Sequence, residues 1–138
     1  MRALGALGLV PFIAAALGVM FLDELLHAVS QRAFLVYSLA ILCFLAGTLW
    51  GEVLGSRSGG AAASVFVSNG VVLFAVFATL TAQPLVAALL LMLGHIAQFW
   101  YEANLSWRER WYTRMRGWLS GGAVIAHLMF LAGLIYRA

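Results

Sequence analysis

Long apolar runs separated by short polar stretches dominate the chain. The runs cover about residues 4–22, 33–54, 64–82, 84–103 and 117–136. Each run has about 20 residues, and a helix of that length is roughly 30 Å long, which matches the hydrocarbon core of a bilayer. The pattern therefore predicts one all-α domain over residues 1–138, an integral membrane bundle of five transmembrane helices.

Polar stretches define the predicted connections. Residues 23–32, DELLHAVSQR, predict a short charged connector, and residues 55–60, GSRSGG, predict a glycine-rich loop. Gln83 and Pro84 leave room only for a tight turn, so the third and fourth helices should be antiparallel neighbours. Residues 104–116, NLSWRERWYTRMR, form the most charged connection. Pro11 predicts a kink in the first helix, where another group must satisfy the freed carbonyl.

Composition strengthens the membrane prediction. Hydrophobic residues make up 64% of the chain and charged residues 9%, whereas soluble domains carry roughly 25% charged residues. The mean hydropathy of +1.00 agrees. A water-soluble fold of 138 residues could not bury so much apolar surface. The single cysteine, Cys43, excludes an intrachain disulfide.

Arginine positions predict an orientation. The net charge of +3 comes from arginine, since the chain has no lysine. With five helices, the N-terminus and the second and fourth loops share one side, which holds Arg2, Arg57, Arg108, Arg110, Arg114 and Arg116. The other side holds Arg32 and Arg137. Positive charge stays in the cytoplasm, so we expect a cytoplasmic N-terminus, an outside C-terminus and a bacterial inner membrane.

Aromatic residues cluster with these arginines. Trp50, Trp100, Trp107 and Trp111 are expected to anchor at the membrane interface, while Arg108, Arg110, Arg114 and Arg116 reach lipid headgroups. Aromatic residues interleaved with arginine also occur in proteins that bind single-stranded nucleic acid. Because membrane helices flank this stretch, we expect the bilayer as its partner and no nucleic acid.

Polar residues within the runs are predicted to form a cluster. Asn69 and Gln98 lie at similar depth in the third and fourth runs, and Glu52 and Glu102 lie near the same cytoplasmic interface. We expect these four residues to gather in the cytoplasmic leaflet, where two interpretations remain open. The cluster either holds helices together by hydrogen bonds and ion pairs, or forms a ligand or proton-handling site.

His95 and His127 form a second candidate site. Both lie near the middle of the bilayer, in consecutive helices. Two histidines at one depth would suit the axial ligation of haem b or a quinone site, if their rings face each other. The alternative is structural hydrogen bonding between helices. We predict no bound cofactor and no metal, with haem b or a quinone as the alternatives.

Glycines recur at the spacing of one helix face. Gly47, Gly51 and Gly55 form a stripe in the second run, and Gly117 and Gly121 repeat the spacing in the fifth. Such faces let another helix approach closely. We expect packing inside the bundle, with homodimerisation as the alternative.

Three motifs resemble those of a known family. They are LGALGLVPF (residues 4–12), FLAGTLWG (44–51) and WYTRMRGWLS (111–120), and their order and spacing extend over nearly the whole chain. The chain resembles the uncharacterised membrane family catalogued as domain of unknown function 3429, which includes mitochondrial transmembrane proteins. The resemblance implies a small multi-span protein and supplies no catalytic residues.

Motifs of common enzyme classes are missing from the sequence. It has no phosphate-binding loop, HExxH, CxxC or GxSxG motif. We therefore expect a non-catalytic structural, assembly or interaction protein, in a homodimer or a larger membrane complex. The alternative is a binder or oligomeric carrier of a small molecule, lipid or quinone that uses the intramembrane polar residues. A redox subunit with haem is a further alternative.

Overall fold

A computed structural model describes residues 2–55, 61–81, 83–105 and 109–138. These residues form helices α1 (Arg2–Leu7), α2 (Val10–Phe21), α3 (Glu24–Gly55), α4 (Ala61–Thr81), α5 (Pro84–Ala103) and α6 (Arg110–Arg137), and none of them forms a strand. Within these described residues, four helices are long and apolar enough to cross a membrane: α3, α4, α5 and α6. The chain is therefore an all-α protein whose helices fit an integral membrane bundle.

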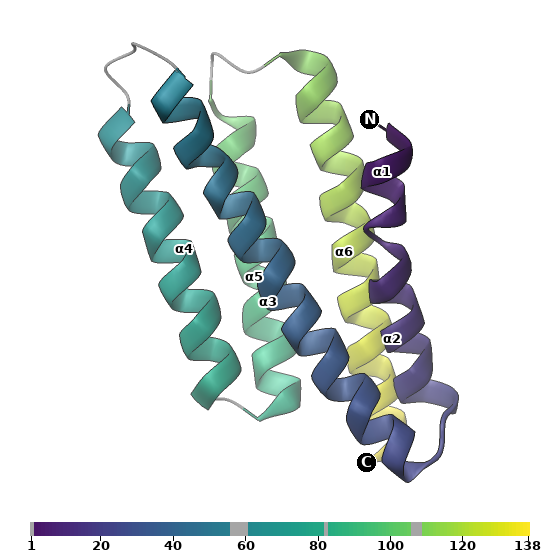
Figure 1. Ribbon diagram of the computed structural model, residues 1–138. Helices are drawn as coiled ribbons and strands as arrows, with labels where there is room; N and C mark the ends of the chain where they lie inside the picture. The colour runs from purple at the N-terminus through teal and green to yellow at the C-terminus, as the bar shows by residue number, and fades with distance from the viewer. Residues whose placement is uncertain (1, 56–60, 82, 106–108) are drawn as a thin grey trace.

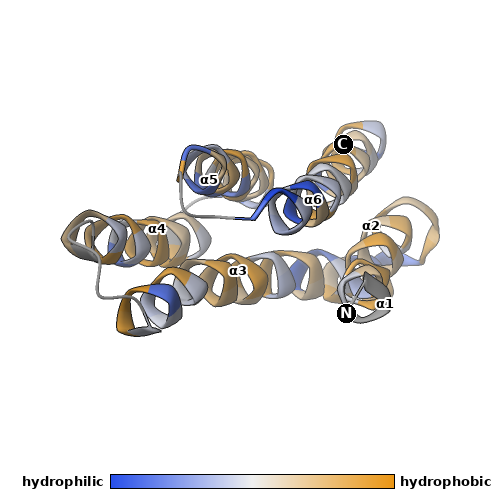
Figure 2. Ribbon diagram, turned by 90° about the horizontal axis from the view of Figure 1, so that it is seen from above, coloured by the Kyte–Doolittle hydropathy of each residue, from blue (hydrophilic) through white to orange (hydrophobic). Residues whose placement is uncertain are grey.

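The helices pack side by side in two rows (Figures 1 and 2). In the view from above, α4, α3 and α2 lie in one row, while α5 and α6 lie in the other. Helix α2 contacts α3 and α6, α3 contacts α4 and α5, and α5 contacts α4 and α6. The N- and C-termini lie at opposite ends of the bundle (Figure 1).

The first apolar run is broken near the expected place. Helix α1 ends at Leu7, and Pro11 lies in the first turn of α2. Between them, Gly8 N and Leu9 N donate to the carbonyls of Gly5 and Ala6 at 3.1 and 3.0 Å, which makes a tight turn. The Tyr37 hydroxyl of α3 donates to the Gly8 carbonyl at 2.7 Å. A neighbouring helix thus supplies the hydrogen bond that an interrupted helix needs in an apolar setting.

Two helices begin earlier than the apolar runs suggest. Helix α3 begins at Glu24, so most of the predicted connector over residues 23–32 is helical. That stretch contains no Gly or Pro, and the negative charge of Glu24 is favourable in a first turn. Helix α6 likewise begins at Arg110, within the charged stretch. Charged residues mark the ends of these apolar runs, but α3 and α6 continue through them.

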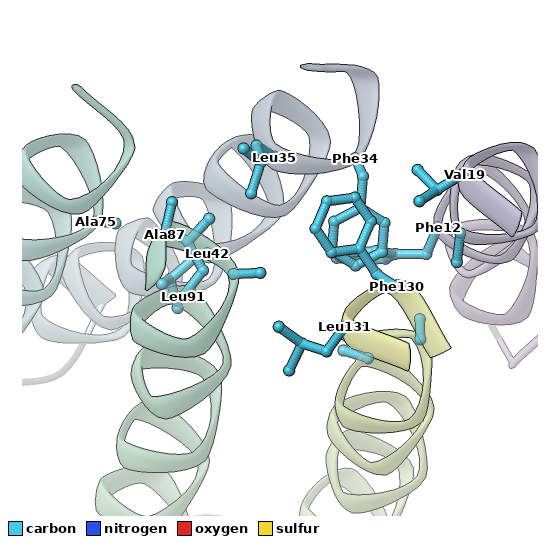
Figure 3. Close-up of a cluster of buried hydrophobic side chains, with 14 residues drawn as sticks. Phe12, Val19, Phe34, Leu35, Leu42, Ala75, Ala87, Leu91, Phe130 and Leu131 are labelled. Carbon is cyan, nitrogen blue, oxygen red and sulfur yellow. The ribbon is translucent and has the colours of Figure 1, made fainter. Parts of the chain in front are cut away.

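Buried side chains fill the space between the rows (Figure 3). Phe34 stacks on Phe130 with ring centroids 4.2 Å apart and meets Phe12 edge-on at 5.3 Å. Leu42 and Leu91 form an aliphatic group nearer to α4 and α5. Large apolar side chains also cover the outside, which is the arrangement expected of a protein surrounded by lipid.

Close helix packing occurs at glycines outside the predicted stripe. A Cβ atom at Gly94 would lie 2.7 Å from a Leu42 methyl group, and one at Gly122 would lie 2.6 Å from Leu9. A Cβ atom at Gly133 would lie 2.9 Å from Met20. These glycines let α5 and α6 approach their neighbours.

The predicted glycine stripe lies on the outside. A Cβ atom at Gly47, Gly51, Gly55 or Gly121 would meet no described atom within 4 Å. At Gly117 it would lie 3.3 Å from Phe99, so this glycine does face a neighbouring side chain. The expectation that the α3 stripe packs inside the bundle is therefore corrected, because a four-residue spacing shows that glycines share a face but not which way it points.

Candidate functional site

His95 of α5 and His127 of α6 lie together in the core. Their exposed fractions are 1% and 0%, and their ring centroids are 5.4 Å apart. Ser38 of α3, also fully buried, lies between them. Its Oγ is 3.2 Å from Nε2 of His95 and 2.9 Å from Nε2 of His127. Three helices therefore meet in one polar group within the apolar core.

The other ring nitrogens of the two histidines differ. Nδ1 of His127 lies 2.7 Å from the carbonyl oxygen of Ala123, one turn earlier in α6. Nδ1 of His95 is buried and has no hydrogen-bond partner in the described part of the chain. Nδ1 of His95 is thus the one ring nitrogen of the two histidines without a hydrogen-bond partner among the described residues. Sequence reasoning missed Ser38, although its mid-run position was a usable signal.

A cavity of about 180 Å³ adjoins His95. It lies between the start of the chain and helices α3, α5 and α6. Its lining is mostly apolar and consists of Gly5, Gly8, Leu9, Phe12, Ile41, Phe44, Leu45, His95, Arg116, Leu119, Ser120 and Ala123. The cavity therefore combines apolar walls with a few polar groups, the usual composition of a small-molecule site.

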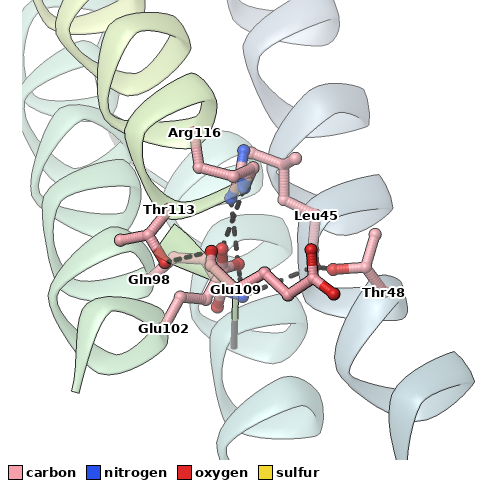
Figure 4. A network of polar contacts seen from close by, with 7 residues as sticks. All are labelled: Leu45, Thr48, Gln98, Glu102, Glu109, Thr113 and Arg116. Carbon is pink, nitrogen blue, oxygen red and sulfur yellow. Dashed lines mark hydrogen bonds and ion pairs between the residues drawn. The ribbon is translucent and has the colours of Figure 1, made fainter. Parts of the chain in front are cut away.

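A buried ion pair lies at the Arg116 side of this cavity (Figure 4). Arg116 of α6 donates through Nε and Nη2 to the two carboxylate oxygens of Glu102, with both distances 2.9 Å. Gln98 donates to Glu102 at 2.7 Å, and its Nε2 lies 3.4 Å from the Leu45 carbonyl of α3. Glu102 and Arg116 are 2% and 3% exposed, so each charge is balanced within the bundle.

The predicted four-residue cluster is only partly assembled. Gln98 and Glu102 do meet, whereas Asn69 is exposed on α4 and lies outside the group. Its neighbour Ser68 points inward and donates to the Ala46 carbonyl at 2.7 Å. Gln98 reaches α3 at Leu45, and Glu52 is a half-buried residue about 10 Å further along that helix.

The predicted interface anchors also divide into two groups. Trp50, Trp100 and Trp111 are 41%, 68% and 52% exposed, and Arg110 and Arg114 are exposed. Arg116 is corrected from a headgroup anchor to the buried partner of Glu102, because its position on α6 faces the bundle. Trp107, Arg108 and the loop residue Arg57 lie outside the described residues.

No metal-binding group is visible among the described side chains. There, no three His, Cys, Asp or Glu residues gather as metal ligands would. The buried histidines instead form a serine-bridged pair, and Glu102 forms an ion pair with Arg116.

Comparisons with known proteins agree with the family resemblance. No curated protein and no solved structure matches the chain. A family model described as protein of unknown function (DUF3429) matches residues 1–132, which confirms the resemblance predicted from the three motifs. The chain belongs to the DUF3429 family.

Proposed function

We propose that this chain is a non-catalytic membrane protein that binds a small, mainly apolar molecule inside its helix bundle. The observation that carries the proposal is the cavity of about 180 Å³, whose mainly apolar lining includes the polar side chains of His95, Arg116 and Ser120.

Cavity size and lining limit the class of ligand. An apolar cavity of about 150 Å³ in another protein holds one benzene molecule. The cavity beside His95 therefore suits one ring or a short chain segment of a lipid-soluble molecule. Lipids and quinones belong to this class, and their remaining chain would have to leave the cavity toward the bilayer.

The histidine geometry favours such a ligand over haem. Axial ligation would need a nitrogen from each ring to face the iron. Both Nε2 atoms instead face the Ser38 hydroxyl, and Nδ1 of His127 faces a backbone carbonyl. Of the four ring nitrogens, Nδ1 of His95 alone has no partner among the described residues, and it is buried.

We infer a five-crossing topology with a cytoplasmic N-terminus in a bacterial inner membrane. The apolar helical stretch Gly5–Phe21 would be the additional crossing, and α2 packs against α6. The arginine distribution supports the orientation. A cysteine added at each terminus should react with a membrane-impermeant reagent from opposite sides; labelling of both from one side contradicts this topology.

Self-assembly is a second candidate role. The outward glycine stripe of α3 would let the same helix of a second copy of this chain approach closely. Gly51 lies at the centre of the stripe, so a larger side chain there separates assembly from ligand binding.

Filling the cavity tests the proposed function. Ser120→Leu places a larger apolar side chain in the lining, while Gly121→Leu changes the adjacent, outward position and serves as control. Each protein is purified in a mild detergent, extracted with organic solvent and examined by mass spectrometry. We expect one lipid-soluble compound at near-stoichiometric yield from the wild type and Gly121→Leu, and at least a tenfold lower yield from Ser120→Leu. Equal yields from all three proteins would contradict the proposal.

A further inference from the structure

A groove on the outside of the bundle lies between α1 and the first half of α6, which are in contact (Figure 1). Gly5 of α1 lets the two helices approach closely, because a Cβ atom there would lie 3.1 Å from a Leu119 methyl group. Ala6 of α1 and Leu9, just before α2, form one wall of the groove. Its volume of about 490 Å³ is within the range of small-molecule sites, roughly 300–1,000 Å³.

One face of α6 forms the opposite wall. It consists of Trp111, Arg114, Met115, Trp118 and Leu119, whose spacings of three and four residues place them on one side of a helix. Arg114 is exposed, and Trp111 and Trp118 are 52% and 80% exposed. A molecule from outside can therefore reach these side chains without any movement of the bundle.

The groove carries one positive charge that no carboxylate of the described chain balances. Arg114 is the only ionisable residue in its lining, and its guanidinium has no ion-pair or hydrogen-bond partner among the described residues. Two carboxylates at this end of the bundle have other partners. Glu109 accepts from the indole N–H of Trp111, and Glu102 is held by Arg116. The groove therefore complements a ligand with a negative charge.

The order of the side chains along α6 matches that of a membrane interface. Arg114 precedes the apolar run over residues 117–136 by three residues, or about 4.5 Å of helix. Trp118 and Leu119 lie in the first turn of that run. At an interface, arginine reaches the phosphate level, tryptophan lies at the headgroup level, and apolar side chains contact acyl chains. A phospholipid would meet these three kinds of side chain in the same order.

We propose that this groove binds one phospholipid with an anionic headgroup. The phosphate lies at Arg114, the indole of Trp118 covers the glycerol region, and the start of an acyl chain lies against Ala6, Leu9 and Leu119. A zwitterionic headgroup would bring a positive group close to the guanidinium. An anionic lipid with the same acyl chains should therefore bind more tightly.

This lipid site is distinct from the cavity beside His95. Leu9 and Leu119 border both, but Arg114 and Trp118 line only the groove. The lipid site therefore does not depend on a ligand in that cavity.

Native mass spectrometry of the full chain in a mild detergent tests the charge preference. The probes are palmitoyl-oleoyl phosphatidylglycerol, which is anionic, and phosphatidylcholine with the same acyl chains, which is zwitterionic. We expect the wild type to bind one phosphatidylglycerol about fivefold more tightly than phosphatidylcholine, the factor that one arginine near anionic lipid contributes. Arg114→Gln should remove this preference. Arg110→Gln, which changes an exposed arginine one turn earlier and outside the lining, should retain it.

A second pair of variants tests the groove without changing its charge. Ala6→Trp places a large side chain in the groove, whereas Leu7→Trp changes the adjacent residue, which is 62% exposed and outside the lining. Ala6→Trp should abolish the tightly bound phosphatidylglycerol because the side chain occupies its place. Leu7→Trp should bind the lipid like the wild type.

Three results would overturn the anionic lipid site. Equal binding of the two lipids by the wild type, or an equal loss of preference in Arg114→Gln and Arg110→Gln, would show that the groove does not select the headgroup. A dimer without bound lipid would show that a second copy of the chain occupies the groove. Phosphatidylglycerol that is lost in Ser120→Leu but retained in Ala6→Trp would lie in the cavity beside His95 instead.

Discussion

Ser38 shows how one residue can join two helices through their histidines. Its hydroxyl lies between Nε2 of His95 and Nε2 of His127, each on a different helix, and Nδ1 of His95 has no partner among the described residues. The depths of the histidines were predictable, because about 1.5 Å of rise per residue converts sequence position into depth. The serine between them was not predicted, since a single hydroxyl in an apolar run usually bonds to its own helix.

Asn69 and Ser68 lie at similar depth along α4 but point in different directions. Both are at the depth of Gln98, but successive residues on a helix point about 100° apart. Ser68 faces α3 and Asn69 faces outward. The depth of the polar group along the bundle was therefore predictable from sequence position. Which residues belong to the group depends on how each helix is rotated about its own axis, and packing determines that rotation.

The Glu102–Arg116 pair provides a prediction at this scale. Replacing Arg116 by Leu leaves the Glu102 carboxylate buried without its counter-charge, and we expect a loss of about 3–5 kcal/mol in stability. The double variant Glu102→Leu/Arg116→Leu removes both charges and should recover most of that loss. Thermal unfolding in detergent measures both effects, with Arg114→Leu on the exposed face as the control. If the double variant is no more stable than Arg116→Leu, the unpaired, buried Glu102 carboxylate is not the cause of the stability loss.

Among the helices, the sequence predicted α4 and α5 better than α3 and α6. Helix α5 has the bounds of the predicted 84–103 run, because Pro84 begins it and Gln83 before it is extended. Helices α3 and α6 continue into charged residues that a hydropathy pattern assigns to loops. Long helices can extend beyond the apolar core, where charged side chains meet water or headgroups.

Glycine positions provide the prediction at the scale of helices. Gly94→Leu should destabilise the bundle by about 1–3 kcal/mol, because Leu42 is fully buried and cannot move away from the new side chain. Gly51→Leu should keep wild-type thermal stability, since it points away from the described core. Light scattering of the detergent-solubilised protein then reports on self-assembly: conversion of a dimer to a well-folded monomer by Gly51→Leu supports the α3 contact. A loss of stability in Gly51→Leu equal to that in Gly94→Leu would contradict the outward placement of the stripe.

The whole molecule combines an apolar exterior with polar groups that meet inside. Its described helices expose large hydrophobic side chains around the bundle and enclose the serine-bridged histidines and the ion pair. The cavity between these two polar groups borders the start of the chain as well as α3, α5 and α6. The first helical segments are thus part of the candidate binding site.

The most direct test of the proposed function is an experimental density map of the protein purified with its native lipids. We predict density for one organic molecule in the cavity, in contact with the lining residues His95 and Ser120. The density should disappear in Ser120→Leu and persist in Gly121→Leu. A cavity that holds only water, or that is closed by side chains of the bundle itself, would contradict the account.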